Sequence, residues 1–319
     1  MCLQLEVCRL RKGMVIFMQR ESFEINNEQE GERLDKILAG IYPGQSRTFF
    51  QKLIKEDHVK VNEKTEKANY RVHAEDLIEV EIPPAVPVAI LPEDIPLDIL
   101  YEDEDLLIVN KPKGMVVHPC PGHYTGTLVN AIMYHCKDQL SGINGEIRPG
   151  IVHRIDKDTT GSLIVCKNDE CHRFIAGQIK EHSVTRRYRG IVSGVVKQES
   201  GRIEGAIGRH PTERKKMAVN EKNGKPAVTH YKVLERFANA TYMEFELETG
   251  RTHQIRVHMA STGHPLLGDT IYGSQKNPYH LQGQTLHAMT IGFIHPSTHE
   301  YMEVSAPLPE YFLKLLKKL

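Results

Sequence analysis

The chain has 319 residues, of which 40% are hydrophobic and 26% charged. This balance is typical of a globular protein and excludes a long disordered tract, a collagen-like repeat and a coiled-coil rod. A chain of this length is expected to form two domains with a sizeable core. It has no run of about eighteen apolar residues and no continuous apolar N-terminal stretch, which argues against a membrane span and a secretory signal and predicts a cytoplasmic location.

The formal net charge is zero, with 41 basic and 41 acidic residues, but the charges are unevenly distributed. Between His172 and Lys232, fourteen lysines and arginines stand against five acidic residues. A solvated surface is one explanation of this excess, and a groove that follows a nucleic-acid backbone is the other. Interspersed tyrosine and histidine side chains favour the groove.

The first part of the chain predicts a small α/β domain over residues 18–82. Residues 1–17 are expected to be an extension or a mis-assigned start, because Met18 opens the first regular polar segment. Beyond it, helical spacing and strand-like alternation of apolar residues follow one another within a short distance. The predicted elements are a helix over 31–41, a second helix capped by Ser46, and strands over 58–61 and 76–82.

Basic side chains gather on and after the second helix of this domain, namely Arg47, Lys52 and Lys60. We expect them to contact RNA phosphates without reading bases. The Ser46–Arg47 helix start and the His-Val-Lys-Val-Asn segment at 58–62 resemble the small RNA-binding module named after the small-subunit ribosomal protein S-four. The resemblance covers about residues 32–81 and implies an RNA-binding domain.

Five prolines within residues 83–97 predict a linker, because proline fits neither a helix interior nor a central strand. Over residues 98–319, strand and helix patterns mix without the regular alternation of a doubly wound fold. Residues 243–248 alternate apolar and acidic side chains, so we expect an α+β domain with a mixed, largely antiparallel sheet. The predicted strands are 106–109, 163–166, 184–195, 228–234, 243–248 and 286–294, and the predicted helices are 127–136, 169–182, 253–261 and 309–319.

The densest polar segment, residues 148–158, places two carboxylates, three cations and His153 in a loop between apolar strands. Loops of this kind usually carry function. A carboxylate beside arginines stays ionised at neutral pH, and an ionised, positioned aspartate can act as a nucleophile or a base. Asp156 is therefore the candidate reactive group, and a turn cap or a structural ion pair is its plain alternative.

A second dense segment holds Arg251, His253, Arg256 and His258. It follows a strand, and Thr252 is expected to cap a helix there. The arginines are expected either to clamp phosphate or to hold a catalytic carboxylate. Zinc is the rival interpretation, but the two histidines lie five residues apart with no glutamate between them, so we predict no metal site. No cofactor is expected either, because the phosphate- and dinucleotide-binding loops are missing.

Four ordered blocks carry a family resemblance. They are Asn110–Gly114 with Val116–Pro119, Gly150–Gly161, Arg186-Arg187-Tyr188, and Gly250–Met259. Together they resemble the RluA-type pseudouridine synthases, and Arg209-His210-Pro211 with Met217-Ala218-Val219 is similar to the RluD-like large-subunit ribosomal RNA group. The resemblance spans nearly everything after Glu32. It implies a pseudouridine synthase catalytic domain that isomerises uridine in RNA without a cofactor.

The resemblance also implies a role for each matching residue. Asp156 would attack the target nucleotide, at the ribose anomeric carbon or at the uracil ring, and the uracil would detach, rotate and rejoin through carbon. Tyr188 would be the base for proton transfer and a stacking platform, and Arg256 would pair with Asp156. The nucleotide must be extruded from its stack, and Arg154 would fill the gap. The other predicted RNA contacts are Arg187, Arg209 and Arg251, with Arg47, Lys52 and Lys60 of the N-terminal domain.

The expected partner is large-subunit ribosomal RNA or its assembly intermediate, bound by a monomer that contacts no membrane. One alternative is a transfer-RNA pseudouridine synthase, because the blocks define the chemistry more than the target. A second alternative is an RNA-binding ribosome assembly factor whose catalytic pocket is unused. For His153 a structural hydrogen bond is as plausible as a direct role, so it stays outside the catalytic set.

Overall fold

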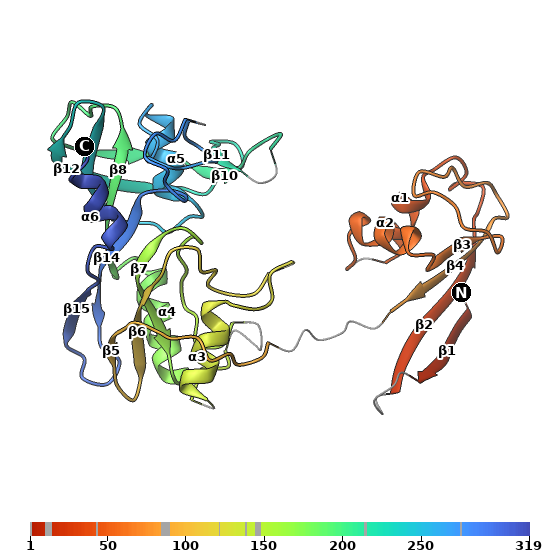
Figure 1. Cartoon of the computed structure of the whole chain (residues 1–319). Helices are drawn as coiled ribbons and strands as arrows, with labels where there is room; N and C mark the ends of the chain where they lie inside the picture. Colours follow the sequence, from red (N-terminus) through yellow and green to blue (C-terminus); the bar gives the residue numbers. More distant parts are fainter. Residues whose placement is uncertain are drawn as a thin grey trace. The chain divides into compact units, whose positions relative to one another are not determined.

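The computed structural model describes residues 2–9, 15–42, 44–83, 90–120, 122–137, 139–143, 148–213, 216–274 and 276–319, and side chains from residue 20 onward. The chain divides into two compact units, residues 1–88 and 89–319, and each is described by itself (Figure 1). The predicted domain limits stay a prediction. Within the described residues, no helix is both long and apolar enough to cross a bilayer.

The first unit is a four-stranded antiparallel sheet with two helices, and its strand order is β1-β2-β4-β3. The sheet and helices enclose a core that includes Leu38, Phe50 and Val80. The predicted cap is present, because Ser46 accepts a hydrogen bond from the backbone N–H of Phe49. The elements are β1 (Cys2–Arg9), β2 (Val15–Glu24), α1 (Leu34–Ile41), α2 (Arg47–Lys55), β3 (Val59–Val61) and β4 (Leu77–Ile82).

Residues 1–17, expected to be an extension or a mis-assigned start, contribute strand β1 and the beginning of β2. The two strands pair antiparallel, from Cys2 opposite Ser22 to Arg9 opposite Val15. The described backbone of this segment is therefore part of the sheet, and whether translation starts there stays open to experiment.

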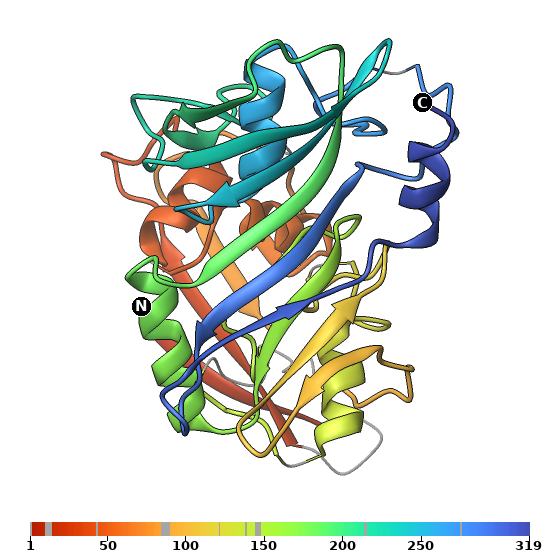
Figure 2. The ribbon, with the colours of Figure 1, turned by 90° about the vertical axis from the view of Figure 1, so that its left-hand side faces the viewer.

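The second unit is built on a nine-stranded sheet in the order β5-β6-β7-β14-β8-β13-β12-β9, with β15 paired to β14 outside this path. Neighbours are antiparallel except β7 and β14, which confirms the predicted largely antiparallel α+β fold. Figure 2 shows β8, β14 and β7 running side by side through the middle of the sheet. The strands are β5 (Ile99–Glu102), β6 (Leu106–Lys111), β7 (Thr160–Cys166), β8 (Thr185–Ser193), β9 (Ser200–Glu204), β12 (Val228–Arg236), β13 (Ala240–Leu247), β14 (Leu286–Ile294) and β15 (Tyr301–Ser305), and a separate ribbon pairs β10 (Ile207–Arg209) with β11 (Met217–Val219).

Helices lie on both faces of this sheet. Helices α3 (Leu128–Cys136) and α5 (Gln254–Ser261) share a core with Leu107 of β6 and Tyr188 of β8. Helix α4 (Asp169–Lys180) packs with Leu106, and α6 (Glu310–Leu316) packs with Ile191. Because successive strand residues point to opposite faces, α3 and α5 cover one face and α4 and α6 the other. Tyr188 is thus on the face of α5.

All ten strands and helices predicted for this unit are present, with ends shifted by a few residues. The strands that were not predicted are short or lie outside the central strands, and three of them, β5, β9 and β15, have no buried residue or alternate only between exposed and half-buried positions. Such strands carry a weak hydrophobic signal, and this is why the periodicity of the sequence does not reveal them.

Strand β7 meets β14 at Gly161, the second residue of β7, shortly after the loop that carries Asp156. Gly161 has φ +109° and stands opposite Ala288. A Cβ atom at this position would overlap the backbone carbonyl group of Ala288. Glycine is therefore required both by the dihedral angle and by the close approach of the two strands.

We predict that Gly161→Ala lowers the free energy of unfolding of the second unit by about 3 kcal/mol, because it combines backbone strain with overpacking against a strand that cannot move aside. Scanning calorimetry of the full chain measures the effect. Gly177→Ala is the matched control: it lies within α4, a Cβ there meets nothing within 4 Å, and alanine favours a helix. Equal melting of the two variants would contradict the proposed constraint.

Candidate active site

Asp156 lies in the loop that precedes β7, between two side chains from the start of α5. Arg256 Nη1 donates to Asp156 Oδ2 at 2.9 Å, and His253 Nε2 lies 3.8 Å from Oδ1. The Asp156 side chain is 18% exposed, so a substrate can reach it. The structure therefore brings together Asp156 and Arg256, which are 100 positions apart in the sequence.

Arg256 is held from its other side by a second carboxylate, Asp269. Arg256 Nε and Nη2 donate to Asp269 at 2.7 and 3.0 Å, and Asp269 also accepts the backbone N–H groups of Ile271 and Tyr272. Burial alone would raise the pKa of Asp269, but Arg256 and these backbone donors outweigh it and lower the pKa. Burial alone would likewise lower the pKa of Arg256, and the two carboxylates raise it. Arg256 and Asp269 are therefore both charged at neutral pH.

A hydrogen-bond chain orients His253 toward Asp156. Tyr272 Oη accepts the backbone N–H of Met217 at 2.9 Å and lies 2.8 Å from His253 Nδ1. We assign the tyrosine proton to that contact, which leaves the proton of a neutral imidazole on Nε2, facing Asp156. Burial is the main reason that the pKa of His253 is lowered, and the charge of Arg256 adds to it against the opposing charge of Asp156.

The start of α5 differs from the prediction. Thr252 does not cap the helix: the N-cap residue is His253, which has φ +59° and makes no capping hydrogen bond with its side chain. The Gln254 side chain binds Thr249 and the backbone N–H of Arg251 instead. The helix therefore begins one residue later than predicted, and His253, in the turn before it, lies beside Asp156.

Tyr188 lies on β8, opposite Phe245 of β13 and Ala288 of β14, and is 8% exposed. Burial raises its pKa; the charge of Arg186 opposes this shift and that of Asp156 adds to it. The neutral phenol is thus the form at neutral pH. In this form Tyr188 can stack on a base and can donate or accept a hydrogen bond.

The fully buried Lys111 and the half-buried His153 fix the loop that carries Asp156. Lys111 Nζ donates to the backbone carbonyls of Pro112, Met115 and Lys157 at 2.8, 2.8 and 2.9 Å, and burial lowers its pKa to about 7 against the charges of Asp158 and Asp156. His153 Nε2 accepts the backbone N–H of Ile164 at 3.0 Å, and burial lowers its pKa to about 3. His153 is therefore neutral and bonded to a strand.

Two of the predicted RNA-binding residues, Arg154 and Arg251, line one pocket of 470 Å³ beside the catalytic loop. The structure does not bring the others of the second unit to it. Arg187 forms an ion pair with Glu303 of β15, and Arg209 is exposed on β10. Their contribution to RNA binding stays a prediction.

The predicted RNA-binding residues of the first unit have different surroundings. Arg47 Nη2 donates to the buried Asp35 at 3.0 Å, so it has a partner within its own domain. Lys52 Nζ lies 3.8 Å from Glu56 on the same helix, and Lys60 is exposed on β3. Of the three, Lys52 and Lys60 are the more open to a phosphate.

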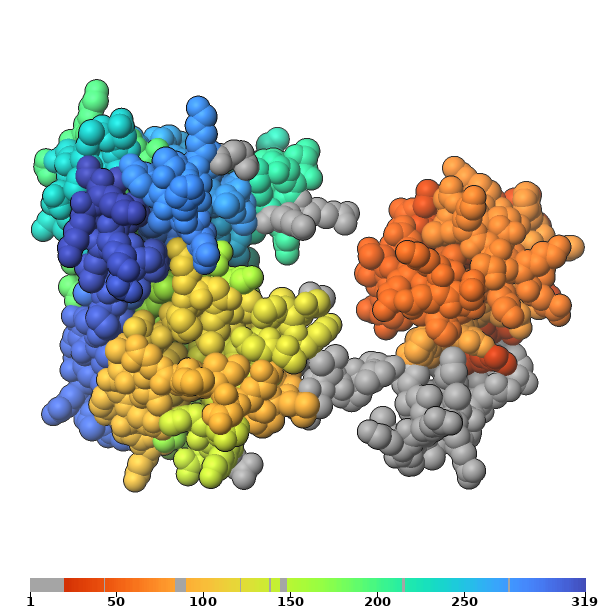
Figure 3. Space-filling model, viewed as in Figure 1, coloured from red at the N-terminus to blue at the C-terminus, as the bar shows by residue number. Residues whose placement is uncertain are grey.

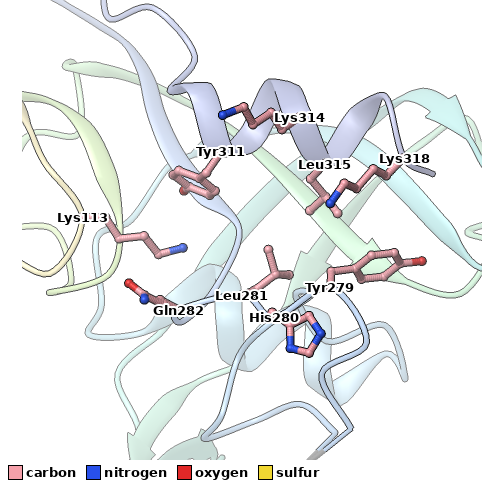
Figure 4. A pocket seen from close by; sticks show the side chains of 9 residues that line it. All are labelled: Lys113, Tyr279, His280, Leu281, Gln282, Tyr311, Lys314, Leu315 and Lys318. Atoms are coloured by element: carbon pink, nitrogen blue, oxygen red, sulfur yellow. The ribbon is translucent and has the colours of Figure 1, made fainter.

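A separate pocket of 410 Å³ lies between α6 and residues 279–282. Helix α6, at the dark-blue end of the colour scale, lies at the surface of the second unit (Figure 3). Lys113 lies over the Tyr311 ring at 4.0 Å, and Figure 4 shows Lys113 and Lys318 pointing toward the middle of the pocket. None of the predicted catalytic residues lines it.

In the part of the chain that the structure describes, no group of potential metal ligands includes Asp156. His258, the second histidine of the zinc alternative, is fully buried and bonds to Thr229 and to the Gly205 carbonyl. Asp103, Asp105 and His295 lie close enough to share an ion. Asp103 Oδ2 is already bonded to His295 at 2.7 Å, so this group is a hydrogen-bond network that ties the β5–β6 turn to the end of β14.

Comparison with known proteins agrees with this geometry. Residues 105–261 match the family described as RNA pseudouridylate synthase, and residues 32–78 match the S4 domain. An uncharacterized RNA pseudouridine synthase, YlyB of Bacillus subtilis, is 50% identical over 302 residues, which are 95% of this chain and 99% of the relative. The ribosomal large subunit pseudouridine synthase D of Zymomonas mobilis is 45% identical and covers 95% of this chain and 98% of its own length. Among solved structures, human RNA pseudouridylate synthase domain containing 1 superposes with a TM-score of 0.57 at 28% identity, over 72% of this chain and 87% of that one.

The chain belongs to the RNA pseudouridine synthase family and is an isomerase. The resemblance seen in the four blocks is thereby confirmed, as is the S-four-type module. Asp269, which follows Leu267-Gly268 after α5, is not among the residues predicted from the sequence, because no local pattern shows its contact with Arg256.

We predict that Asp269→Asn lowers kcat roughly 10- to 100-fold with little change in KM for RNA, because an asparagine cannot balance Arg256, whose misplacement would shift Asp156. Single-turnover pseudouridine formation and RNA binding measure the two terms. Asp103→Asn is the matched control, since it also removes a carboxylate bonded to a cationic or histidine side chain but contacts no residue of the catalytic loop. A parallel rise in KM, or an equal loss in the control, would argue for general destabilisation.

Proposed function

We propose that this protein isomerises uridine to pseudouridine in large-subunit ribosomal RNA and that Asp156 is the reacting carboxylate. Family membership establishes the reaction class, and relatives named as ribosomal large subunit pseudouridine synthase D support the substrate. The observation that carries the residue assignment is a partly exposed carboxylate whose Oδ2 is held by a buried arginine.

The arrangement leaves Oδ1 of Asp156 facing the substrate side, next to the Nε2–H of His253. In the isomerisation the bond from N1 to the ribose C1′ breaks and a bond from C5 to C1′ forms. C5 loses a proton and N1 gains one, so no oxidant, reductant or phosphate donor is consumed. Asp156 attacks either C1′ or the uracil ring, and Tyr188 stacks on the base and takes part in the proton transfer.

RNA binding in this proposal involves both units. The S-four-type unit holds the RNA through exposed cations such as Lys52 and Lys60, and Arg154 and Arg251 contact it beside the catalytic loop. A uracil within a stack cannot reach Asp156, so the enzyme extrudes it at a cost of roughly a few kcal/mol. Arg154, exposed two residues before Asp156, fills the vacated position.

We also propose that the enzyme acts as a monomer in the cytoplasm and needs neither a metal ion nor a cofactor. The balanced isomerisation supports the last point, and the ribosomal relatives support the location. Transfer RNA as the substrate, and a non-catalytic role in ribosome assembly, are alternative outcomes of the experiments that follow.

We predict that Asp156→Asn abolishes pseudouridine formation while RNA affinity stays within about twofold, because the amide keeps the size of the side chain and removes its nucleophilic oxygen. Purified protein and a large-subunit ribosomal RNA transcript provide the assay. Undiminished product from the variant would refute the role of Asp156.

Mapping of pseudouridine in total RNA from deletion and wild-type cells identifies the substrate. Loss of a modification in large-subunit ribosomal RNA is the expected result. Loss of pseudouridine in transfer RNA alone would identify transfer RNA as the substrate instead. Unchanged modification with altered ribosomal particles would favour a role as an assembly factor.

We predict that Tyr188→Phe lowers kcat by roughly 10²- to 10⁴-fold, the usual loss for a proton-transfer group, while the ring continues to stack. Rapid-quench measurement at saturating RNA isolates the chemical steps. If kcat changes less than twofold, Tyr188 serves as a platform alone and the proton moves through another group.

A further inference from the structure

Arg186 is a buried guanidinium that has no carboxylate partner among the residues that the structure describes. Arg186 is 7% exposed. Its Nη2 donates to the Glu248 carbonyl at 3.3 Å, and its Nε has no hydrogen-bond partner among the described residues. The neighbouring arginines of β8 differ: Arg189 Nη2 lies 2.9 Å from Glu244, and Arg187 pairs with Glu303. Burying an unpaired cation is costly, so a ligand that completes its coordination is the simplest reason to keep it.

Arg186 lines the 470 Å³ pocket that also holds Arg154 and Arg251. Lys180 and His182, at the end of α4 and just beyond it, contribute two further basic side chains, and none of the described residues that line the pocket is acidic. Five side chains that carry or can carry positive charge thus meet at one concave surface. Such a surface attracts an anion more strongly than scattered surface cations do.

Gly250 leaves room for the guanidinium at the wall of this pocket. A Cβ atom at Gly250 would lie 2.6 Å from Arg186 Nη1. The glycine has a negative φ, so its backbone conformation does not require glycine. A side chain at this position would collide with Arg186, so the glycine leaves the space that the guanidinium occupies.

The pocket is placed beside the reacting base. Arg186 and Tyr188 lie two residues apart on β8 and share its buried face, which separates them by about 7 Å along the strand. Arg154, which lines the same pocket, precedes Asp156 by two residues. An anion bound by Arg186 thus lies close enough to Tyr188 and Asp156 to belong to the same RNA strand as the target uridine.

We propose that Arg186 is the receptor for a phosphodiester of the RNA backbone next to the extruded uridine, with Arg251 binding the same anionic group from the outside. The inference rests on the proposed function and adds a subsite to it. A planar guanidinium with free N–H donors matches two phosphate oxygens, and in a buried setting each of these hydrogen bonds is strong. The bound phosphate supplies the negative charge that the protein does not place there.

The test compares RNA affinity in an Asp156→Asn background, so that chemistry does not enter the measurement. With a large-subunit ribosomal RNA transcript, Arg186→Met is expected to weaken binding roughly tenfold at physiological salt and to reduce the slope of log affinity against log salt by about one. Arg189→Met, on the opposite face of the same strand, is the matched control, with binding changed less than twofold.

Thermal unfolding separates a binding role from a structural one. Arg186→Met removes an unpaired buried charge and keeps the length of the side chain, so its melting midpoint is expected to equal or exceed that of the parent. A lower midpoint together with an unchanged salt slope would show that Arg186 stabilises the fold, and would overturn the proposal. Arg186→Lys, which keeps the charge and loses the planar fork, is expected to keep the slope and lose part of the affinity.

Inorganic phosphate distinguishes the sources of the anion. It is expected to raise the melting midpoint of the Asp156→Asn protein but not of the Arg186→Met variant, and to compete weakly with the transcript. Stabilisation by phosphate without any effect of Arg186→Met on RNA binding would identify a small-anion site and overturn the RNA assignment. These outcomes do not depend on activity, so failure here and failure of the Asp156 assignment are told apart.

Discussion

The buried guanidinium of Arg256, shared between Asp156 and Asp269, is the interaction on which the site depends. Asp269 is fully buried and accepts from two of the nitrogens, whereas Asp156 accepts from the third through Oδ2 and has its Oδ1 beside His253. A lone ion pair at this depth would gain little over its desolvation. The second carboxylate and the backbone donors that hold it offset the desolvation cost, and they hold the Asp156 carboxylate in one position.

The sheet brings these groups together from distant parts of the sequence. Asp156 enters β7 through Gly161, where β7 approaches β14 too closely for any side chain, and Tyr188 stands on β8 on the other side of β14. Arg256 comes from α5 on the same face. Lys111 then fastens the carbonyl of Lys157, so the loop is fixed on the side away from the substrate. Rigid strands and buried hydrogen bonds thus position a group that itself stays accessible.

The sequence predicts what depends on local pattern. Apolar periodicity reveals the long strands and the helices, and the order of the blocks identifies Asp156, Tyr188 and Arg256 before their proximity is seen. Contacts between residues that are distant in the sequence are not predicted by local pattern, because the sequence shows a charged residue but not which group lies opposite it in the fold. Asp269, the Tyr272–His253 contact and the burial of Lys111 all depend on tertiary packing, and the expected Thr252 cap is replaced by His253 in a left-handed conformation, so the helix begins one residue later.

The pairing of charges in the fold also explains how a chain with no net charge can attract a polyanion. Among the cations expected to meet RNA, Arg187 forms an ion pair with Glu303, and Arg47 shares the carboxylate of Asp35 with Arg33. Arg154, Arg186 and Arg251 surround a pocket without a carboxylate, beside the loop of Asp156. Position and pairing therefore matter more than the number of basic residues. In the proposed mechanism, the attraction is concentrated where the RNA backbone must come close for one uridine to reach Asp156.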